Sequence, residues 1–116
     1  MSSPASEAPL IVFVTVPDAE VGASLARVLV GEQLAACVNI LPRVRSIYAW
    51  KGEVKDEDEA LCLVKTRAEL FPALEARLTS LHPYEVPEIL GVAPTTGNGP
   101  YLRWLAEATG IPTAGA

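Results

Sequence analysis

The apolar residues of the chain follow two different spacings, and the alternation of these spacings predicts the order of its elements. Residues 10–16 form an apolar run broken only by Thr15, which indicates a buried strand. Residues 36–50, 53–66 and 86–92 also have extended character. These four segments are predicted to be the strands of one sheet.

Between the strands, apolar residues recur with the three- and four-residue spacing of amphipathic helices. The two apolar faces consist of Val21, Leu25, Val28 and Leu29 in the first helix and Leu70, Leu74, Leu78 and Leu81 in the second. Asp18 precedes the first helix and is predicted to cap it through its carboxylate. The second helix is predicted to start near Glu69, because Pro72 then falls in the first turn, and to end at His82. A short third helix is predicted over residues 100–108.

The two middle strands are predicted to form a long hairpin. Lys51 and Gly52 supply its tight turn, and Pro42 marks a bulge or an edge because it has no N–H to donate. The resulting order is strand-helix-strand-strand-helix-strand plus a terminal helix. This order is typical of the α+β ferredoxin-like split βαβ sandwich, in which two helices cover one face of a four-stranded antiparallel sheet.

Both faces of this sheet are predicted to need burial. The strands over residues 10–16 and 53–66 have apolar residues at consecutive positions, whereas a strand with one wet face alternates. Helices cover only one face, and the terminal helix is too short to cover the other. The sequence therefore predicts a partner subunit on the helix-free face, reached by a hairpin that carries Tyr48 and Trp50.

Composition and charge narrow the classes of function. The chain has 116 residues, 50% of them hydrophobic, so one domain is expected over residues 10–109, between disordered tails over 1–9 and 110–116. Nine basic against fourteen acidic residues give a net charge of −5, which argues against nucleic-acid binding. No apolar run approaches the roughly 18–20 residues that cross a membrane, and the expected location is the cytoplasm. Cys37 and Cys62 lie in apolar segments and are predicted to be buried, reduced thiols.

Several spaced motifs resemble one known family. In chain order they are ACVNI at residues 36–40, SIYAWKG at 46–52, VKT at 64–66, HPYEVPEI at 82–89 and YLRW at 101–104. Together they resemble the CutA divalent-cation tolerance family over residues 10–108. The resemblance implies a ferredoxin-like fold, a tight homotrimer and an association with tolerance of copper and other divalent cations. It also implies a fold like that of the trimeric PII signalling proteins.

The candidate metal contacts are His82 and Cys37, which carry the imidazole and thiolate groups that copper prefers. Each has an alternative interpretation: His82 as a ring that bonds a last-turn carbonyl at a helix C-terminus, and Cys37 as a small buried hydrophobe. Some members of the family carry a second histidine beside this one and a cysteine at the end of the first strand, where this chain has Leu81 and Val14. An acidic run at residues 56–59 offers carboxylates to hard cations but is expected to be a solvated shoulder of the hairpin.

The remaining candidates concern surfaces between subunits. A PII-like small-molecule cleft is the alternative function, and its candidate residues are Lys65, Tyr84, Glu85, Glu88 and Trp50. Interface anchors are expected at Tyr48, Trp50, Tyr101 and Trp104. Catalysis is not expected, since the chain has no phosphate-binding loop and Cys37 sits within an apolar strand. The chain is therefore predicted to be a homotrimer that binds divalent metal ions, copper foremost, and not an enzyme.

Overall fold

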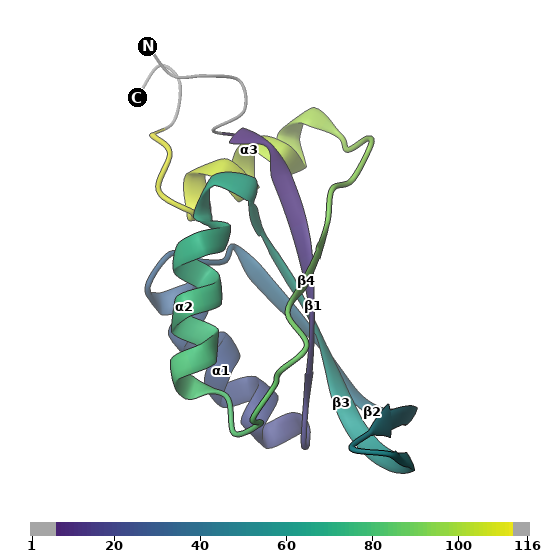
Figure 1. The fold of residues 1–116 in the computed structure, drawn as a ribbon. Helices are drawn as coiled ribbons and strands as arrows, with labels where there is room; N and C mark the ends of the chain where they lie inside the picture. The colour runs from purple at the N-terminus through teal and green to yellow at the C-terminus, as the bar shows by residue number, and fades with distance from the viewer. Residues whose placement is uncertain (1–6, 113–116) are drawn as a thin grey trace.

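The computed structural model describes residues 7–112. In chain order its elements are β1 (Pro9–Val16), α1 (Ala19–Gly31), β2 (Cys37–Trp50), β3 (Glu53–Arg67), the 3-10 turn η2 (Ala68–Leu70), α2 (Phe71–Leu81), β4 (Leu90–Val92) and α3 (Gly99–Ala108). The strands form one antiparallel sheet in the order β2-β3-β1-β4, and α1 and α2 pack against one of its faces (Figure 1). This arrangement confirms the predicted ferredoxin-like sandwich. Within the described residues, none of the helices is both long and apolar enough to traverse a bilayer.

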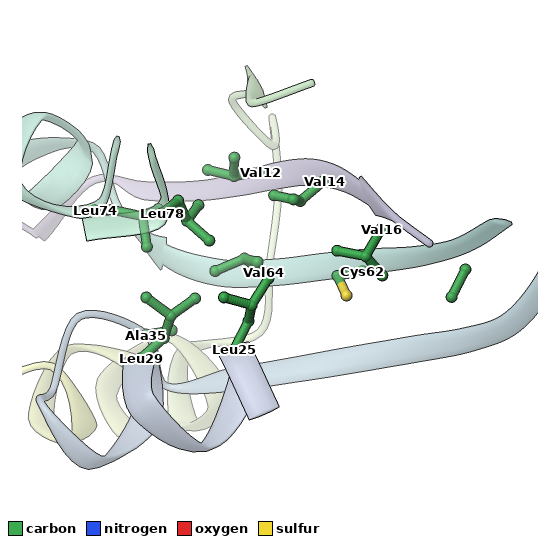
Figure 2. Close-up of a cluster of buried hydrophobic side chains, with 11 residues drawn as sticks. Val12, Val14, Val16, Leu25, Leu29, Ala35, Cys62, Val64, Leu74 and Leu78 are labelled. Atoms are coloured by element: carbon green, nitrogen blue, oxygen red, sulfur yellow. The ribbon is translucent and has the colours of Figure 1, made fainter. Parts of the chain in front are cut away.

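The core lies between the sheet and helices α1 and α2 (Figure 2). Alternate residues of β1 and β3 point toward the helices, because successive side chains of a strand face opposite sides of the sheet. The buried side chains are Val12, Val14 and Val16 of β1, Ala60, Cys62 and Val64 of β3, Leu25 and Leu29 of α1, and Leu74 and Leu78 of α2. A Cβ atom at Gly22 would lie 3.1 Å from the Sγ of Cys62, so this glycine allows α1 to approach the sheet closely.

Helix α1 begins with the predicted side-chain cap, whereas α2 begins at Phe71, two residues after the predicted start and without a side-chain cap. The Oδ1 of Asp18 accepts a hydrogen bond from the N–H of Val21 at 2.9 Å, which caps α1. The turn η2 precedes α2, so Pro72 falls in the first turn of the helix, where no N–H is required of it.

The strands β2 and β3 form a hairpin that extends beyond the rest of the sheet (Figure 1). Lys51 and Gly52 form its turn with positive φ angles of 50° and 79°, which match the twist of a two-residue hairpin. The register between the two strands shifts between Leu41 and Val44, so the irregularity predicted at Pro42 is present.

The strand β4 is shorter than the sequence predicts. The expected strand covered residues 86–92, but only Leu90–Val92 pairs with β1. Pro87 has no N–H to contribute to a ladder. Near the end of β1, the ring of His82 contacts the carbonyl of Thr15. The segment before β4 therefore leaves the sheet edge and is held by side chains.

The face of the sheet opposite α1 and α2, here called the helix-free face, is apolar as predicted. Directly opposed residues on neighbouring strands share a face. By this register the apolar residues of the helix-free face are Ile11, Phe13, Leu41, Leu61, Leu63, Leu90 and Val92. Leu41, Leu90 and Val92 remain 40%, 61% and 49% exposed, so a large apolar surface of the single chain contacts solvent.

The terminal helix α3 is fastened to the sheet by Arg67 at the end of β3. The Nε of Arg67 donates to the Oγ1 of Thr109 at 2.8 Å, and its Nη2 donates to the Thr109 carbonyl at 2.9 Å. Leu105 and Ala106 are buried on the inner side of the helix, whereas Trp104 is exposed. Both residues of the Arg67–Thr109 pair are buried, so these bonds form in a low-dielectric setting where hydrogen bonds to a charge are strong.

The tails predicted over residues 1–9 and 110–116 fall mostly outside the described residues. At the described ends the chain contacts the domain: the carbonyl of Ala8 accepts a hydrogen bond from the N–H of Ala68, and the N–H of Ile111 bonds back to α3. The backbone is therefore hydrogen-bonded to the domain at Ala8 and at Ile111.

Replacing Leu74 with alanine is expected to lower the free energy of unfolding by about 2–5 kcal/mol, because the side chain is fully buried between α2 and the sheet and a cavity would remain. Leu81 on the same helix is 37% exposed, and Leu81→Ala is the matched control with a smaller loss. Urea unfolding at one fixed protomer concentration measures both values. Equal losses in the two variants would contradict this description of the core.

Candidate functional site

A groove of about 930 Å³ lies between the outer part of the hairpin and the segment at residues 83–88. Its lining combines aromatic and acidic side chains. The aromatic residues are Tyr48, Trp50 and Tyr84, and the acidic ones are Glu57, Asp58, Glu59, Glu85 and Glu88. One basic residue, Arg45, also lines it among the described residues. This volume is in the range of small-ligand sites, and the lining is strongly acidic.

The pleat of β3 divides the acidic run at residues 56–59 into two pairs. Asp56 accepts two hydrogen bonds from Arg45, at 2.9 Å from Nε and 2.7 Å from Nη2. Asp58 forms an ion pair with Arg43 at 3.0 Å. The bidentate contact with Arg45 lowers the pKa of Asp56. These two carboxylates are therefore neutralised by basic side chains of β2 and are exposed, as predicted for a hairpin shoulder.

The other two acids of the run bind phenol groups. Tyr48 donates a hydrogen bond to Glu57, and Tyr84 donates one to the Oε2 of Glu59 at 2.6 Å. The bond to Glu57 raises the pKa of Tyr48 to about 12, and burial together with Glu59 raises the pKa of Tyr84 further. Glu59 is only 8% exposed, so the expectation of a solvated run is wrong at this residue.

Glu59 and Glu88 form the electrostatic centre of the groove. Within the described residues, neither carboxylate has an ion-pair partner, and the hydrogen bond from Tyr84 comes from a neutral group. Burial, and then the charge of Glu59, raise the pKa of Glu88. Glu88 is exposed but Glu59 is buried, and a buried negative charge without a positive partner is costly. This pair is therefore a place where the fold leaves room for a cation.

The ring of His82 is engaged at both nitrogens. Its Nε2 lies 2.7 Å from the carbonyl oxygen of Thr15, an acceptor, so Nε2 carries the proton and donates it. Its Nδ1 accepts a hydrogen bond from the backbone N–H of Tyr84 at 3.1 Å. The sequence predicted a bond from the ring to a last-turn carbonyl, but it is the backbone N–H of His82 that bonds the carbonyl of Leu78. The ring instead ties the segment at 83–88 to β1, and a metal ion at Nδ1 would displace the Tyr84 bond.

The two cysteines differ in their surroundings. Cys62 is buried, and burial raises the pKa of its thiol, in agreement with an inert core residue. Cys37 is only partly buried at the start of β2, where its Sγ lies 3.8 Å from the Oδ1 of Asn39. The prediction of a buried thiol is therefore confirmed for Cys62 and wrong for Cys37. Both are free, as expected.

The structure does not bring His82 and Cys37 together. Cys37 lies opposite Lys65, which in turn lies opposite Ile11 of β1, whereas the ring of His82 contacts Thr15. Four residues along a strand correspond to about 13 Å, so one ion cannot bind both side chains of one protomer. Across the described residues, no group of three or more His, Cys, Asp or Glu side chains is arranged to hold a metal ion. A metal contact at either residue by itself stays a prediction.

Four of the five residues predicted for a ligand cleft do line the groove, namely Trp50, Tyr84, Glu85 and Glu88, whereas Lys65 does not. A lysine that sequence reasoning left out, Lys51, lies at the groove mouth. Its Nζ is 5.4 Å from the ring centroid of Trp50 and 3.3 Å from the Oε2 of Glu85. Glu57 and Glu59 were not predicted as groove residues. The two-residue period of a strand could have indicated them, because it places them on the opposite face from Asp56 and Asp58.

The predicted interface aromatics lie at two distant places (Figure 1). Tyr48 and Trp50 belong to the hairpin, and Tyr101 and Trp104 belong to α3, where their ring centroids are 5.6 Å apart. Tyr48, Tyr101 and Trp104 are 39%, 36% and 44% exposed. Their role as anchors between subunits stays a prediction.

Glu88→Gln is expected to stabilise the protein at pH 7 in metal-free buffer. Since the pKa of Glu88 is raised on folding, its protonated form favours the folded state below the ordinary glutamate value of about 4.3, and this contribution is lost as the pH rises through the raised value. Urea unfolding should therefore show a gain for the variant at pH 7 that disappears near pH 4. The exposed Glu75 supplies the control, Glu75→Gln. A variant no more stable than the wild type at pH 7 would contradict the unpaired-charge interpretation.

Comparison with known proteins places the chain among relatives of the same fold. A family model described as CutA1 divalent ion tolerance protein matches residues 10–108. The divalent-cation tolerance protein CutA of Thermus thermophilus is 52% identical over 100 residues, which cover 86% of this chain and 97% of that protein. Human protein CutA is 44% identical over 97 residues, and the match covers 84% of this chain and 54% of the longer human protein.

Solved structures agree with the sequence comparison. The divalent cation tolerance protein of Thermus thermophilus superposes with a TM-score of 0.85 at 51% identity, covering 88% of this chain and 99% of that one. CutA1 from Oryza sativa superposes with a TM-score of 0.86 at 41% identity, covering 90% and 96%. A family model that spans nearly the whole described domain, together with these identities, shows that the chain belongs to the CutA1 divalent ion tolerance family.

Proposed function

We propose that the chain works as a homotrimer that binds divalent cations in the acidic groove, and that it acts by binding and not by catalysis. The observation that carries the proposal is a buried carboxylate, Glu59, beside an exposed one, Glu88, neither of which has a basic partner among the described residues. A divalent cation would supply the missing positive charge. The relatives named for divalent-cation tolerance support the same class of ligand.

The donor atoms favour particular ions. Carboxylate and phenol oxygens suit Mg²⁺, Ca²⁺ and Mn²⁺. At a site of nitrogen or oxygen donors, Cu²⁺ binds more tightly than its neighbours in the first transition row. Copper therefore remains the foremost transition-metal ion in this proposal. The proposed ligand residues are Glu59 and Glu88, whereas the sequence indicated His82 and Cys37.

The proposed homotrimer follows from two unpartnered surfaces. The helix-free face exposes Leu41, Leu90 and Val92, and the outer hairpin exposes Ile47 and Val54 at 64% and 78%. Because these patches differ, contact between them is head-to-tail, and such a contact closes into a ring of three when each subunit is rotated by a third of a turn from the next. The groove lies beside the hairpin, so assembly would place it next to a neighbouring subunit.

A small-molecule sensor of the PII-like kind is the second candidate. The groove volume of about 930 Å³ supports it, since a small organic ligand would fit. The acidic lining argues against an anionic ligand such as a nucleotide. A cytoplasmic location is part of the proposal and is supported by the two free cysteines, since reduced thiols are usual there.

Light scattering on the full chain at micromolar concentration is expected to give three times the 12.3 kDa mass of one chain. Contact between subunits would bury the exposed apolar face, and this burial stabilises the trimer. Leu90→Asp, which places a charge on the helix-free face, is expected to shift the mass toward that of one chain. A wild-type monomer at these concentrations would overturn the assembly.

Calorimetric titration with Mn²⁺ and Cu²⁺ tests the metal site. Glu59→Gln and Glu88→Gln are each expected to weaken binding about ten-fold or more, since each removes a charged oxygen ligand. Cys37→Ser is expected to leave the affinity unchanged, whereas His82→Asn is expected to weaken it less than either glutamate variant, because the ring only positions the segment at 83–88. If the affinity falls only in the cysteine and histidine variants, the ions bind the side chains that the sequence first indicated, and the groove is not the metal site.

A further inference from the structure

We propose that the same groove binds a linear organic polyamine, with one ammonium group between Glu59 and Glu88. Its methylene chain would lie along the aromatic wall, formed by Tyr48, Trp50 and Tyr84. This goes beyond divalent-cation binding because it concerns a different class of ligand and uses parts of the groove that a metal ion does not need. Four features of the groove support it: its volume, its aromatic residues, the position of Lys51 and the distribution of its unpaired charge.

The volume exceeds what a metal ion requires. One water molecule occupies about 30 Å³ in the liquid, so an ion with a few waters would fill a small part of a groove of about 930 Å³. An extended organic molecule matches this volume better. The shape therefore favours a ligand with a chain over a single ion.

The aromatic residues suit an organic cation. Tyr48, Trp50 and Tyr84 line the groove together with the acids. The faces of aromatic rings attract ammonium groups, and their apolar surface packs against methylene groups. A hydrated metal ion gains little from such a wall, whereas a polyamine uses both of its properties.

The chain's own Lys51 shows how an amine is held at the groove mouth. Its ammonium lies 5.4 Å from the ring centroid of Trp50 and 3.3 Å from a carboxylate oxygen of Glu85. A primary ammonium on an alkyl stem is the same chemical group that ends a polyamine. A second ring and carboxylate, Tyr84 and Glu59, also line the groove and are joined by a hydrogen bond of 2.6 Å.

The inner part of the groove has negative charge but no resident ammonium. Arg45, the basic side chain of the lining, makes a bidentate contact with Asp56. Glu59 is nine-tenths buried, and its one hydrogen bond comes from the phenol of Tyr84. Glu88 has no hydrogen-bond or ion-pair partner among the described residues. An ammonium has three N–H donors, enough for both carboxylates and one further acceptor.

Spermidine is the probe, titrated calorimetrically into the full-length protein, with 1,8-octanediol as an uncharged chain of similar length. Spermidine is expected to bind and the diol not to bind. Glu59→Gln is expected to weaken spermidine binding about ten-fold or more. Trp50→Leu is expected to weaken it about three-fold and to leave Mn²⁺ binding unchanged. Glu75→Gln removes one exposed charge outside the groove and is expected to change neither.

A second measurement avoids altering the groove. The chain has two tryptophans, so in Trp104→Phe the emission comes from Trp50 alone, and spermidine should change it saturably. Absence of spermidine binding while Mn²⁺ still binds would overturn the polyamine site and leave the proposed function intact. Equal weakening by Glu75→Gln and Glu59→Gln would show nonspecific attraction to an acidic protein, and this too would overturn it. Loss of Mn²⁺ binding with spermidine binding retained would instead count against the proposed function.

Discussion

The pleat of β3 brings the core, the apolar outer face and the groove onto a single strand. Because consecutive side chains alternate between faces, one strand serves the core, the helix-free face and the groove at once. Ala60, Cys62 and Val64 face the helices, and Leu61 and Leu63 face the other side. The same alternation continues into the hairpin, where it separates the acids held by arginines from those held by tyrosines.

The groove is a product of tertiary contacts that hold the segment at 83–88 against the hairpin. The ring of His82 bonds the carbonyl of Thr15, the hydroxyl of Tyr84 bonds Glu59, and at the mouth Lys51 pairs with Glu85. These contacts come from β1, β3 and the hairpin turn, so the wall of the groove depends on the sheet being in register. His82 thus contributes to the site by positioning this segment.

The site also illustrates a conflict between stability and binding. Among residues 7–112, Glu59 and Glu88 have no basic partner, so their charged forms disfavour the folded state, and burial together with the charge of Glu59 raises the pKa of Glu88. Residues that reduce stability in this way are expected where a ligand completes the charge balance. Metal ions and polyamines both supply positive charge to these carboxylates. Only a polyamine would also contact the aromatic side chains of the groove.

The order of the elements, the Asp18 cap, the hairpin turn and the two-sided apolar sheet could be predicted from the sequence, because spacing and backbone chemistry are local properties. It also identified the family through motifs that lie in order along the chain. The burial of Glu59 near Glu88, the distance between His82 and Cys37, and the position of Lys65 outside the groove became visible in the folded chain. Burial of a charge and the partner of a ring nitrogen depend on which distant segments meet, and a pattern along one chain carries no measure of that.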